Sequence, residues 1–248
     1  MNLVDNLYAY LWPGQTLAEM QSYGNNCNSY LIANCLYGDR HVIVDPGQVI
    51  NEMRRPCLNN LLGQMSQDGI RVEDVGLVIN THAHPDHFGA SHDIKERSNA
   101  FVALSEKDDE YRKTVGEEIR KMFGDVPGIT MPKFEPDFYL QEGQLNLGNG
   151  VNLTILHTPG HSPGHISIYW PAEKVLIAGD VIFFGSTGRV DLPGGSAAAL
   201  KQSIDNLSQL DIEYLLTGHQ YGAPGIIQGK ENIRRNFDFV KREVFPYL

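Results

Sequence analysis

The chain has little cysteine: its 248 residues include only Cys27, Cys35 and Cys57. Because three is an odd number and no pair has CxxC spacing, we expect no disulfide framework and interpret each cysteine as a small buried residue. The first residues contain neither a basic start nor an apolar stretch, so no secretory signal is expected. These absences together predict a reducing, cytoplasmic setting.

Two further absences exclude classes of partner. No apolar run approaches the ~20 residues that a membrane span needs, so we expect no membrane partner. The formal net charge is −10 and the pI is near 5.3. No basic patch interrupts this acidic character, and nucleic acid is therefore not expected, because its phosphates would be repelled. The expected partner is a small-molecule substrate, and a homo-oligomer remains compatible with the sequence.

The apolar content and its pattern indicate one α/β domain over residues 1–248. A hydrophobic fraction of 42% is ample for a single large core. Short apolar runs bounded by Gly, Pro or polar residues predict strands at 7–12, 28–33, 41–45, 76–80, 101–104, 138–140, 151–157, 165–170, 174–178 and 214–216. Helical spacing predicts helices at about 56–66, 88–97, 105–123, 196–210 and 230–246. We interpret the segment at about 105–135 as a helical lid or insertion, and the last helix as packing onto the body.

The most informative stretch is Thr81-His82-Ala83-His84-Pro85-Asp86-His87, which directly follows an apolar run. As a surface turn it would gain nothing from crowded imidazoles, which repel each other when protonated. An extended backbone, with its period of two, would send His82, His84 and Asp86 to one side. His87 would then point toward a second centre. Because imidazoles with a carboxylate suit Zn²⁺, and also Fe or Mn, this loop predicts ligands for two metals.

Three more candidate ligands, His161, Asp180 and His219, follow glycine near the ends of predicted strands. Such a position exposes one side chain at the rim of a sheet and lets a metal approach the backbone closely. Each residue alone could equally be a loop residue or a helix cap. The recurrence of the same pattern favours one shared site. Asp45 is interpreted as a support that holds the second nitrogen of a histidine, and His165 as a core or supporting residue.

The order of these residues closely resembles that of the metallo-β-lactamase superfamily, over about residues 28–219. The resemblance implies a four-layer αββα sandwich, with the metals in a groove at one edge of the two sheets. It also implies two ligand sets, the first being His82, His84 and His161 and the second Asp86, His87 and His219, with Asp180 and a hydroxide bridging two divalent ions. Zinc is the expected metal, with iron or manganese as alternatives. Since true β-lactamases usually lack the bridging aspartate, Asp180 points away from antibiotic hydrolysis.

Within the superfamily, the chain is most similar to glyoxalase II (hydroxyacylglutathione hydrolase) and its compact relatives. Gly218-His219-Gln220-Tyr221 resembles the Gly-His-Glu-Tyr of that enzyme, whose tyrosine contacts glutathione. Arg189 stands where glyoxalase II has a glutathione-binding lysine. Tyr221 and Arg189 are therefore the predicted substrate residues. The sequence departs from the long enzymes at Asp191, where they have a tyrosine, and in having one C-terminal helix instead of a helical domain.

The expected function is hydrolysis of a small thioester or ester by the bridging hydroxide, with Asp86 and Asp180 as catalytic residues. No general acid is obvious, which favours thioesters because a thiolate leaves without a proton. Two alternatives stay open: a persulfide dioxygenase with one iron, and a lactonase or phosphodiesterase of the same fold. Arg189 could also pair locally with Asp191, and Tyr221 could pack as part of the pocket wall.

Overall fold

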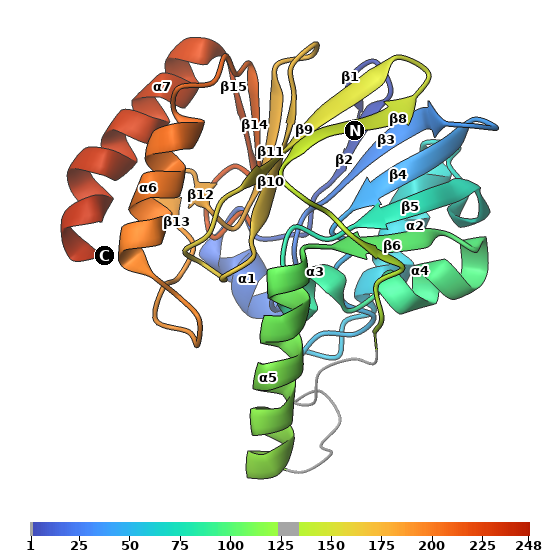
Figure 1. Cartoon of the computed structure of the whole chain (residues 1–248), viewed down its shortest axis with the longest axis horizontal. Helices are drawn as coiled ribbons and strands as arrows, with labels where there is room; N and C mark the ends of the chain where they lie inside the picture. The colour runs from blue at the N-terminus through green and yellow to red at the C-terminus, as the bar shows by residue number, and fades with distance from the viewer. Residues whose placement is uncertain (1, 124–133) are drawn as a thin grey trace.

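The computed structural model describes residues 2–123 and 134–248. Two β-sheets face each other, and helices cover their outer faces (Figure 1). This is the four-layer αββα sandwich, so the predicted fold class is confirmed. No helix in the described part of the chain is long and apolar enough to cross a membrane.

The first sheet has seven strands in the order of the chain, antiparallel from β1 to β4 and parallel from β4 to β7. Its strands are β1 Asn2–Val4, β2 Leu7–Tyr10, β3 Ser29–Leu36, β4 Arg40–Val44, β5 Val75–Ile79, β6 Phe101–Leu104 and β7 Phe138–Tyr139. The helices of this half are α1 Leu17–Tyr23, α2 Cys57–Gln67, α3 Pro85–Phe88, α4 Ser91–Ser98 and α5 Glu106–Phe123. Because β4, β5 and β6 run parallel, their carboxyl ends share one edge of the sheet.

The second sheet has six strands in the order β15-β14-β11-β10-β9-β8, and only the β11–β14 pair is parallel. Its strands are β8 Gly143–Gly148, β9 Val151–His157, β10 Ile166–Trp170, β11 Val175–Gly179, β14 Tyr214–Thr217 and β15 Ile226–Gln228. A two-stranded hairpin, β12 Ile182–Phe183 and β13 Ser186–Thr187, follows β11. The helices of this half are α6 Ala197–Leu207 and α7 Lys230–Phe239, which continues into a π-helical turn at Val240–Val244 and a 3₁₀ turn at Phe245–Tyr247.

The core divides into three apolar clusters, as the period of two along a strand requires. On β4, Val42 and Val44 face the second sheet, whereas Ile43 packs with α2 and α4. On β11, Ile177 faces the first sheet and Leu176 packs with α6 and α7. Burial of each such side chain contributes about 1.5–3 kcal/mol relative to exposure. The sheets are therefore apolar on both faces, and polar residues gather at their edge.

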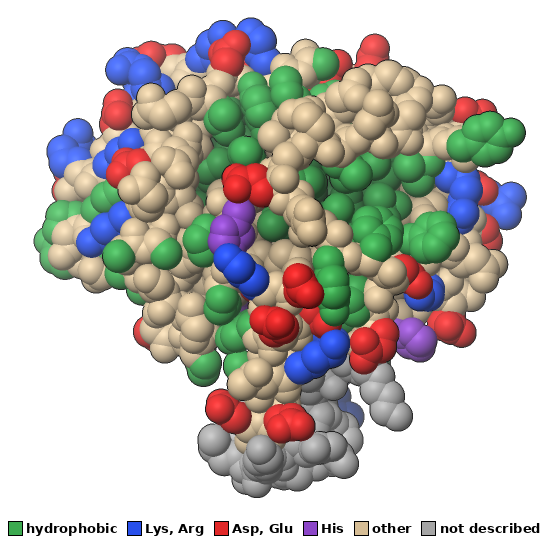
Figure 2. Space-filling view, viewed as in Figure 1, with side chains coloured by type: hydrophobic (Ala, Val, Ile, Leu, Met, Phe, Trp, Pro, Cys, Tyr) green, Lys and Arg blue, Asp and Glu red, His purple; other side chains and the backbone are tan. Residues whose placement is uncertain are grey.

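Several predicted elements differ from the structure. The helix predicted from residue 88 to 97 corresponds to α4, which begins three residues later, at Ser91. The short helices α1 and α3 and the short strands β1, β8, β12, β13 and β15 were not predicted. Helix α5 projects away from the two sheets (Figure 1). Part of the predicted lid at about 105–135 lies outside the described residues. Figure 2 shows acidic and basic side chains interspersed on the visible face, without a large patch of one sign.

Candidate metal centre

The seven predicted ligands lie at the edge where strands of both sheets end. The first sheet supplies His82 and His84 from the loop after β5, and Asp86 and His87 from α3. The second sheet supplies His161 from the β9–β10 loop, Asp180 directly after β11, and His219 two residues after β14. Because each residue follows a strand that is fixed in a sheet, the backbone positions the whole set.

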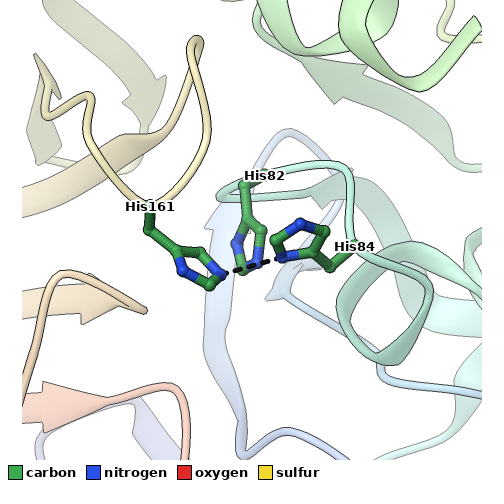
Figure 3. Close-up of side chains that lie close together, drawn as sticks. All are labelled: His82, His84 and His161. Atoms are coloured by element: carbon green, nitrogen blue, oxygen red, sulfur yellow. Dashed lines mark hydrogen bonds between the residues drawn. The ribbon is translucent and has the colours of Figure 1, made fainter. Parts of the chain in front are cut away.

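One group of ligands contains His82, His84 and His161, whose nitrogens lie within 4.8 Å of one another. His84 Nδ1 is 2.8 Å from His161 Nε2, and the three rings converge from loops of both sheets (Figure 3). His82 and His161 are buried, and His84 is half-buried. We call this set the three-histidine group.

A second group contains Asp86, His87 and His219, which we call the acidic group. His87 Nε2 is 3.1 Å from His219 Nε2, and His219 Nε2 is 3.3 Å from Asp86 Oδ2. His87 and His219 are buried. The arrangement brings a carboxylate and two imidazoles to one point.

The Asp180 carboxylate lies between the two groups. One oxygen is 3.5 Å from His161 Nε2 and 3.4 Å from His219 Nε2, and the other is 3.3 Å from His87 Nε2. Asp180 therefore contacts one ligand of the three-histidine group and two of the acidic group. This is the position that a bridging carboxylate requires.

The prediction that alternation places Asp86 beside His82 and His84 is wrong. Pro85 is the first residue of α3, a position that proline favours, and the backbone changes from extended to helical there. Asp86 therefore joins His87 in the acidic group. The structure brings together both sets that the family resemblance implies, and a third set, His82, His87 and Asp180, spans them.

The second nitrogen of each histidine is occupied by a neighbour. His87 Nδ1 is 2.8 Å from Asp45 Oδ2, and His161 and His219 donate through Nδ1 to the backbone carbonyls of Arg189 and Asn26 at 2.8 and 3.0 Å. Such contacts fix the tautomer and turn the other nitrogen toward the centre. His82 Nδ1 and His84 Nε2 are likewise 3.0 and 3.3 Å from the hydroxyls of Thr81 and Tyr111.

Asp45 supports the site at two points, in line with its predicted role. Besides the contact with His87, its carboxylate accepts hydrogen bonds from Thr81 N at 2.7 Å and Thr81 Oγ1 at 2.6 Å. Thr81 in turn contacts His82. The residue has φ 51°, in the left-handed region that Asp and Asn tolerate better than most residues. His165 also supports the centre, since its Nε2 accepts a hydrogen bond from Asp180 N at 3.1 Å.

Two buried atoms of the set lack a hydrogen-bond partner within the described residues: His82 Nε2 and Asp180 Oδ1. An unsatisfied buried polar atom costs about 1–3 kcal/mol, and native structures rarely tolerate it without a reason. Coordination of metal ions would satisfy both atoms. Five imidazoles and two carboxylates fit divalent cations such as Zn²⁺, Fe²⁺ or Mn²⁺.

The electrostatics of the two groups differ. Burial, and then the neighbouring imidazoles, hold the pKa of His82 well below its ordinary value, and burial lowers the pKa of His84 to about 4. Burial acts to lower the pKa of His87 and His219, but the neighbouring carboxylates together outweigh it: Asp180 at both residues, with Asp45 at His87 and Asp86 at His219. The pKa of His87 is therefore raised, and that of His219 is raised to about 9.

The two carboxylates of the centre stay ionised. Burial acts to raise the pKa of Asp86 and of Asp180. The imidazoles of His87 and His219 outweigh this effect, and both pKa values lie well below the ordinary range. Both side chains therefore offer negative oxygens to a cation at neutral pH.

A cavity of about 450 Å³ borders the acidic group at His219. It is lined by Trp12, Pro13, Gly14, Met20, Gly24, Asn25, Asn26, Glu52, Arg189, His219, Gln220 and Tyr221. A larger and mostly apolar cavity of about 650 Å³, between β15 and α7, contains none of the predicted site residues. The smaller cavity is therefore the one placed to hold a substrate.

The two predicted substrate residues both line this cavity. The Tyr221 ring stacks on the His219 ring, with centroids 4.6 Å apart and an interplanar angle of 16°. The Arg189 guanidinium is exposed and pairs with Asp191 through contacts of 2.9 and 2.8 Å. A substrate carboxylate would therefore have to compete with Asp191 for Arg189.

Sequence reasoning missed Asn25, which supports Asp86. Its Nδ2 donates to Asp86 Oδ2 at 2.6 Å, and its backbone N–H donates to Glu52 at 2.6 Å. The run Asn25-Asn26-Cys27-Asn28 was the available signal, because consecutive amide side chains are unusual in a stretch that leads into a buried strand.

The chain matches the profile of the Metallo-beta-lactamase superfamily over residues 22–219. It belongs to that superfamily. One similar protein is the probable metallo-hydrolase MJ0888 of Methanocaldococcus jannaschii, which is 33% identical over 82% of this chain and 92% of that protein. The hydroxyacylglutathione hydrolase GloC of Haemophilus influenzae is 37% identical, over 54% of this chain and 64% of that enzyme.

Solved structures of the superfamily share the fold. The metallo-beta-lactamase family protein TTHA1429 of Thermus thermophilus aligns with a TM-score of 0.75 and 23% identity, over 98% of this chain and 80% of that chain. TTHA1623 in a di-iron-bound form aligns with a TM-score of 0.63 and 29% identity, over 87% of this chain and 92% of that chain. The predicted family is thus confirmed, and the chain is a superfamily hydrolase with a candidate site for divalent metal ions.

Proposed function

We propose that this metallo-β-lactamase superfamily member is a binuclear hydrolase that cleaves a small thioester or ester. The observation that carries the proposal is the position of Asp180, within 3.5 Å of nitrogens from both ligand groups. A carboxylate within reach of nitrogens from both ligand groups is placed to be shared by two metals, one in each group. The unsatisfied atoms His82 Nε2 and Asp180 Oδ1 support the same proposal.

The chemistry divides between the ions and the chain. When bound, two divalent cations supply a water of near-neutral pKa and stabilise the oxyanion that develops on an attacked carbonyl. Three of the histidines contact a neighbouring group through Nδ1: His87, His161 and His219. These contacts fix each ring so that its Nε2 faces the metal centre. Asp86, fixed by Asn25, stays ionised and orients the attacking water.

The cavity beside His219 favours a small substrate. Its volume of about 450 Å³ lies within the range of small-molecule sites, about 300–1,000 Å³. Tyr221 offers a hydroxyl and a ring face on one wall, and Arg189 offers a cation at the rim. The similarity to the GloC hydroxyacylglutathione hydrolase supports a thioester as the substrate.

Zinc is the proposed metal, because imidazole nitrogens and carboxylate oxygens are the usual ligands of zinc in hydrolases. Iron is the first alternative, since TTHA1623 is described in a di-iron-bound form. The identity of the metal and the type of reaction can be tested together.

The test begins by removing metals with a chelator and adding back Zn²⁺, Fe²⁺ or Mn²⁺ separately. Each form is assayed for release of thiol from S-lactoylglutathione, with a lactone, a phosphodiester and a β-lactam as comparison substrates. We expect two metals per chain and thioester cleavage above all other activities. Oxygen consumption with glutathione persulfide, at one iron per chain and without hydrolysis, would contradict the proposal.

A further inference from the structure

Asp108 is a buried carboxylate in the first turn of α5, and it contacts both halves of the sandwich. One oxygen accepts hydrogen bonds from Ala83 N at 2.7 Å and Ser162 Oγ at 2.8 Å. The other accepts from Gly164 N at 2.6 Å. Three donors therefore converge on one ionisable side chain that is not itself a predicted ligand.

The three donors lie beside the ligands of the three-histidine group. Ala83 stands between His82 and His84 in the loop of the first sheet. Ser162 directly follows His161 in the loop of the second sheet, and Gly164 lies two residues further. One carboxylate thus connects the two loops whose ligands must meet.

We propose that Asp108 is a positioning residue of the metal centre, which fixes the distance between the His82–His84 loop and His161. By this role it sets the affinity of the three-histidine group for its metal. The inference rests on the metal centre of the proposed function and is independent of the substrate.

The site requires a carboxylate because every neighbour is a donor. An asparagine has the same shape, but its NH₂ group would face either the Gly164 N–H or the Ala83 N–H, and that hydrogen bond would be lost. The chain around Asp108 is closely packed, so the loops cannot easily rearrange to compensate. Even a Cβ added at Gly164 would clash, because it would lie 2.4 Å from Asp108 N and from Ser105 Oγ. The loops would therefore have to move apart.

A small movement matters for these ligands in particular. His84 Nδ1 and His161 Nε2 are only 2.8 Å apart, and they belong to the two loops that Asp108 connects. In the acidic group, His87 and His219 are held instead by Asp45 and the Asn26 carbonyl. Loss of Asp108 should therefore weaken one metal and spare the other.

Asp109 provides a matched control. It is the next residue of the same helix, is also buried, and carries the same charge. Its carboxylate binds Arg112, Lys113 and Tyr139. Asp109→Asn should therefore lower stability through lost ion pairs, while leaving the metal loops in place.

The experiment compares the full-length parent with Asp108→Asn and Asp109→Asn. Each protein is freed of metal and titrated with Zn²⁺ against a chromophoric chelator, and Co²⁺ spectra report the geometry of each group. Folding is checked by circular dichroism and thermal unfolding. For Asp108→Asn we expect the affinity for one of two metals to fall about 10–100-fold, the usual effect of removing an outer-shell partner. The second metal, and both metals in Asp109→Asn, should bind as in the parent.

Two results would overturn the inference: unchanged affinities in Asp108→Asn, or equal losses in both variants, which would reflect general destabilisation. If Asp108→Asn does not fold, the test uses Ser162→Ala, which removes one hydrogen-bond donor and leaves the Asp108 carboxylate. A fall of less than about 10–100-fold in the affinity of the three-histidine group for zinc supports the positioning role, and an unchanged affinity overturns it. A parent that binds no metal would also overturn the proposed function, so the two failures are distinguishable.

Discussion

The three-histidine group and the acidic group differ in how ready they are to receive a cation. His82 and His84 are neutral at pH 7, because burial holds their pKa values low. His87 and His219 have raised pKa values, because carboxylates surround them. A cation that enters the acidic group must therefore displace protons from charged imidazoles, whereas one that enters the three-histidine group meets His82 and His84 in their neutral form.

The groups also differ in access. His219 lines the cavity of about 450 Å³, so the acidic group is next to the proposed substrate. The three-histidine group is held between loops that α5 connects through Asp108. The acidic group therefore borders the cavity proposed to hold the substrate, whereas the three-histidine group is enclosed between two loops.

The largest effect is expected from Asp180→Ala, which removes the residue shared by both groups. Loss of a residue that only hydrogen-bonds to a metal ligand typically lowers activity about 10–100-fold. Activity should fall by more than this in Asp180→Ala, because Asp180 is itself a proposed ligand. The metal content should also fall, while circular dichroism stays unchanged. Assay of thiol release and elemental analysis measure the two effects. Full activity in this variant would exclude the bridging role.

Asp45→Asn should lower the metal affinity of the acidic group more than that of the three-histidine group. Asparagine tolerates the left-handed backbone at this position, so the fold should persist. The lost charge weakens the hold on His87, and we expect about 10–100-fold lower affinity in the acidic group. The three-histidine group, which Asp45 reaches only through Thr81, should lose less. Zinc titration checks this order, and a reversed order would contradict it.

The pH dependence of metal binding should differ between the groups. The pKa of His219 is about 9 in the metal-free protein, above its ordinary value, so this imidazole is protonated at pH 7. Affinity in the acidic group should fall as pH decreases below about 9, and binding should release protons. His84, with a pKa of about 4, becomes protonated only near that pH. Dialysis at decreasing pH followed by elemental analysis should show that the metal of the acidic group is lost before the metal of the three-histidine group. Loss of both metals at the same pH would refute a difference in pH dependence between the groups.

The smallest effect is expected from Arg189→Ala. The guanidinium is about two-thirds exposed and already paired with Asp191, and exposed pairs of this kind contribute about 0–1 kcal/mol. We expect KM for a glutathione thioester to rise up to about fivefold, with kcat nearly unchanged. Steady-state kinetics with Asp191→Ala as the comparison variant measure this. An unchanged KM would remove Arg189 from the substrate site.

The ligands could be predicted from the sequence because their identity is local. His82 to His87 form one consecutive motif, and His161, Asp180 and His219 each follow a glycine. The division into two groups could not be predicted from periodicity alone, since it depends on α3 beginning at Pro85. Strands of two or three residues, such as β12 and β15, contain too few positions to show alternation.

The supporting contacts were harder to predict, for two physical reasons. Asp108 lies in the run Glu106-Lys107-Asp108-Asp109-Glu110, which has the composition of a solvated helix face. Only the folded chain shows that one of these carboxylates is buried against two loops. The carbonyls of Arg189 and Asn26 act through the backbone, and a backbone group leaves no mark in the amino-acid sequence.

The segment before residue 22 lies outside the family match, yet Trp12, Pro13, Gly14 and Met20 form one wall of the cavity. Hydrogen bonds from Gln220 to the Trp12 carbonyl and from Gly222 N to the Gly14 carbonyl fasten this wall to the loop that bears His219. The shape of the cavity that borders His219 therefore depends in part on residues outside the region that defines the family.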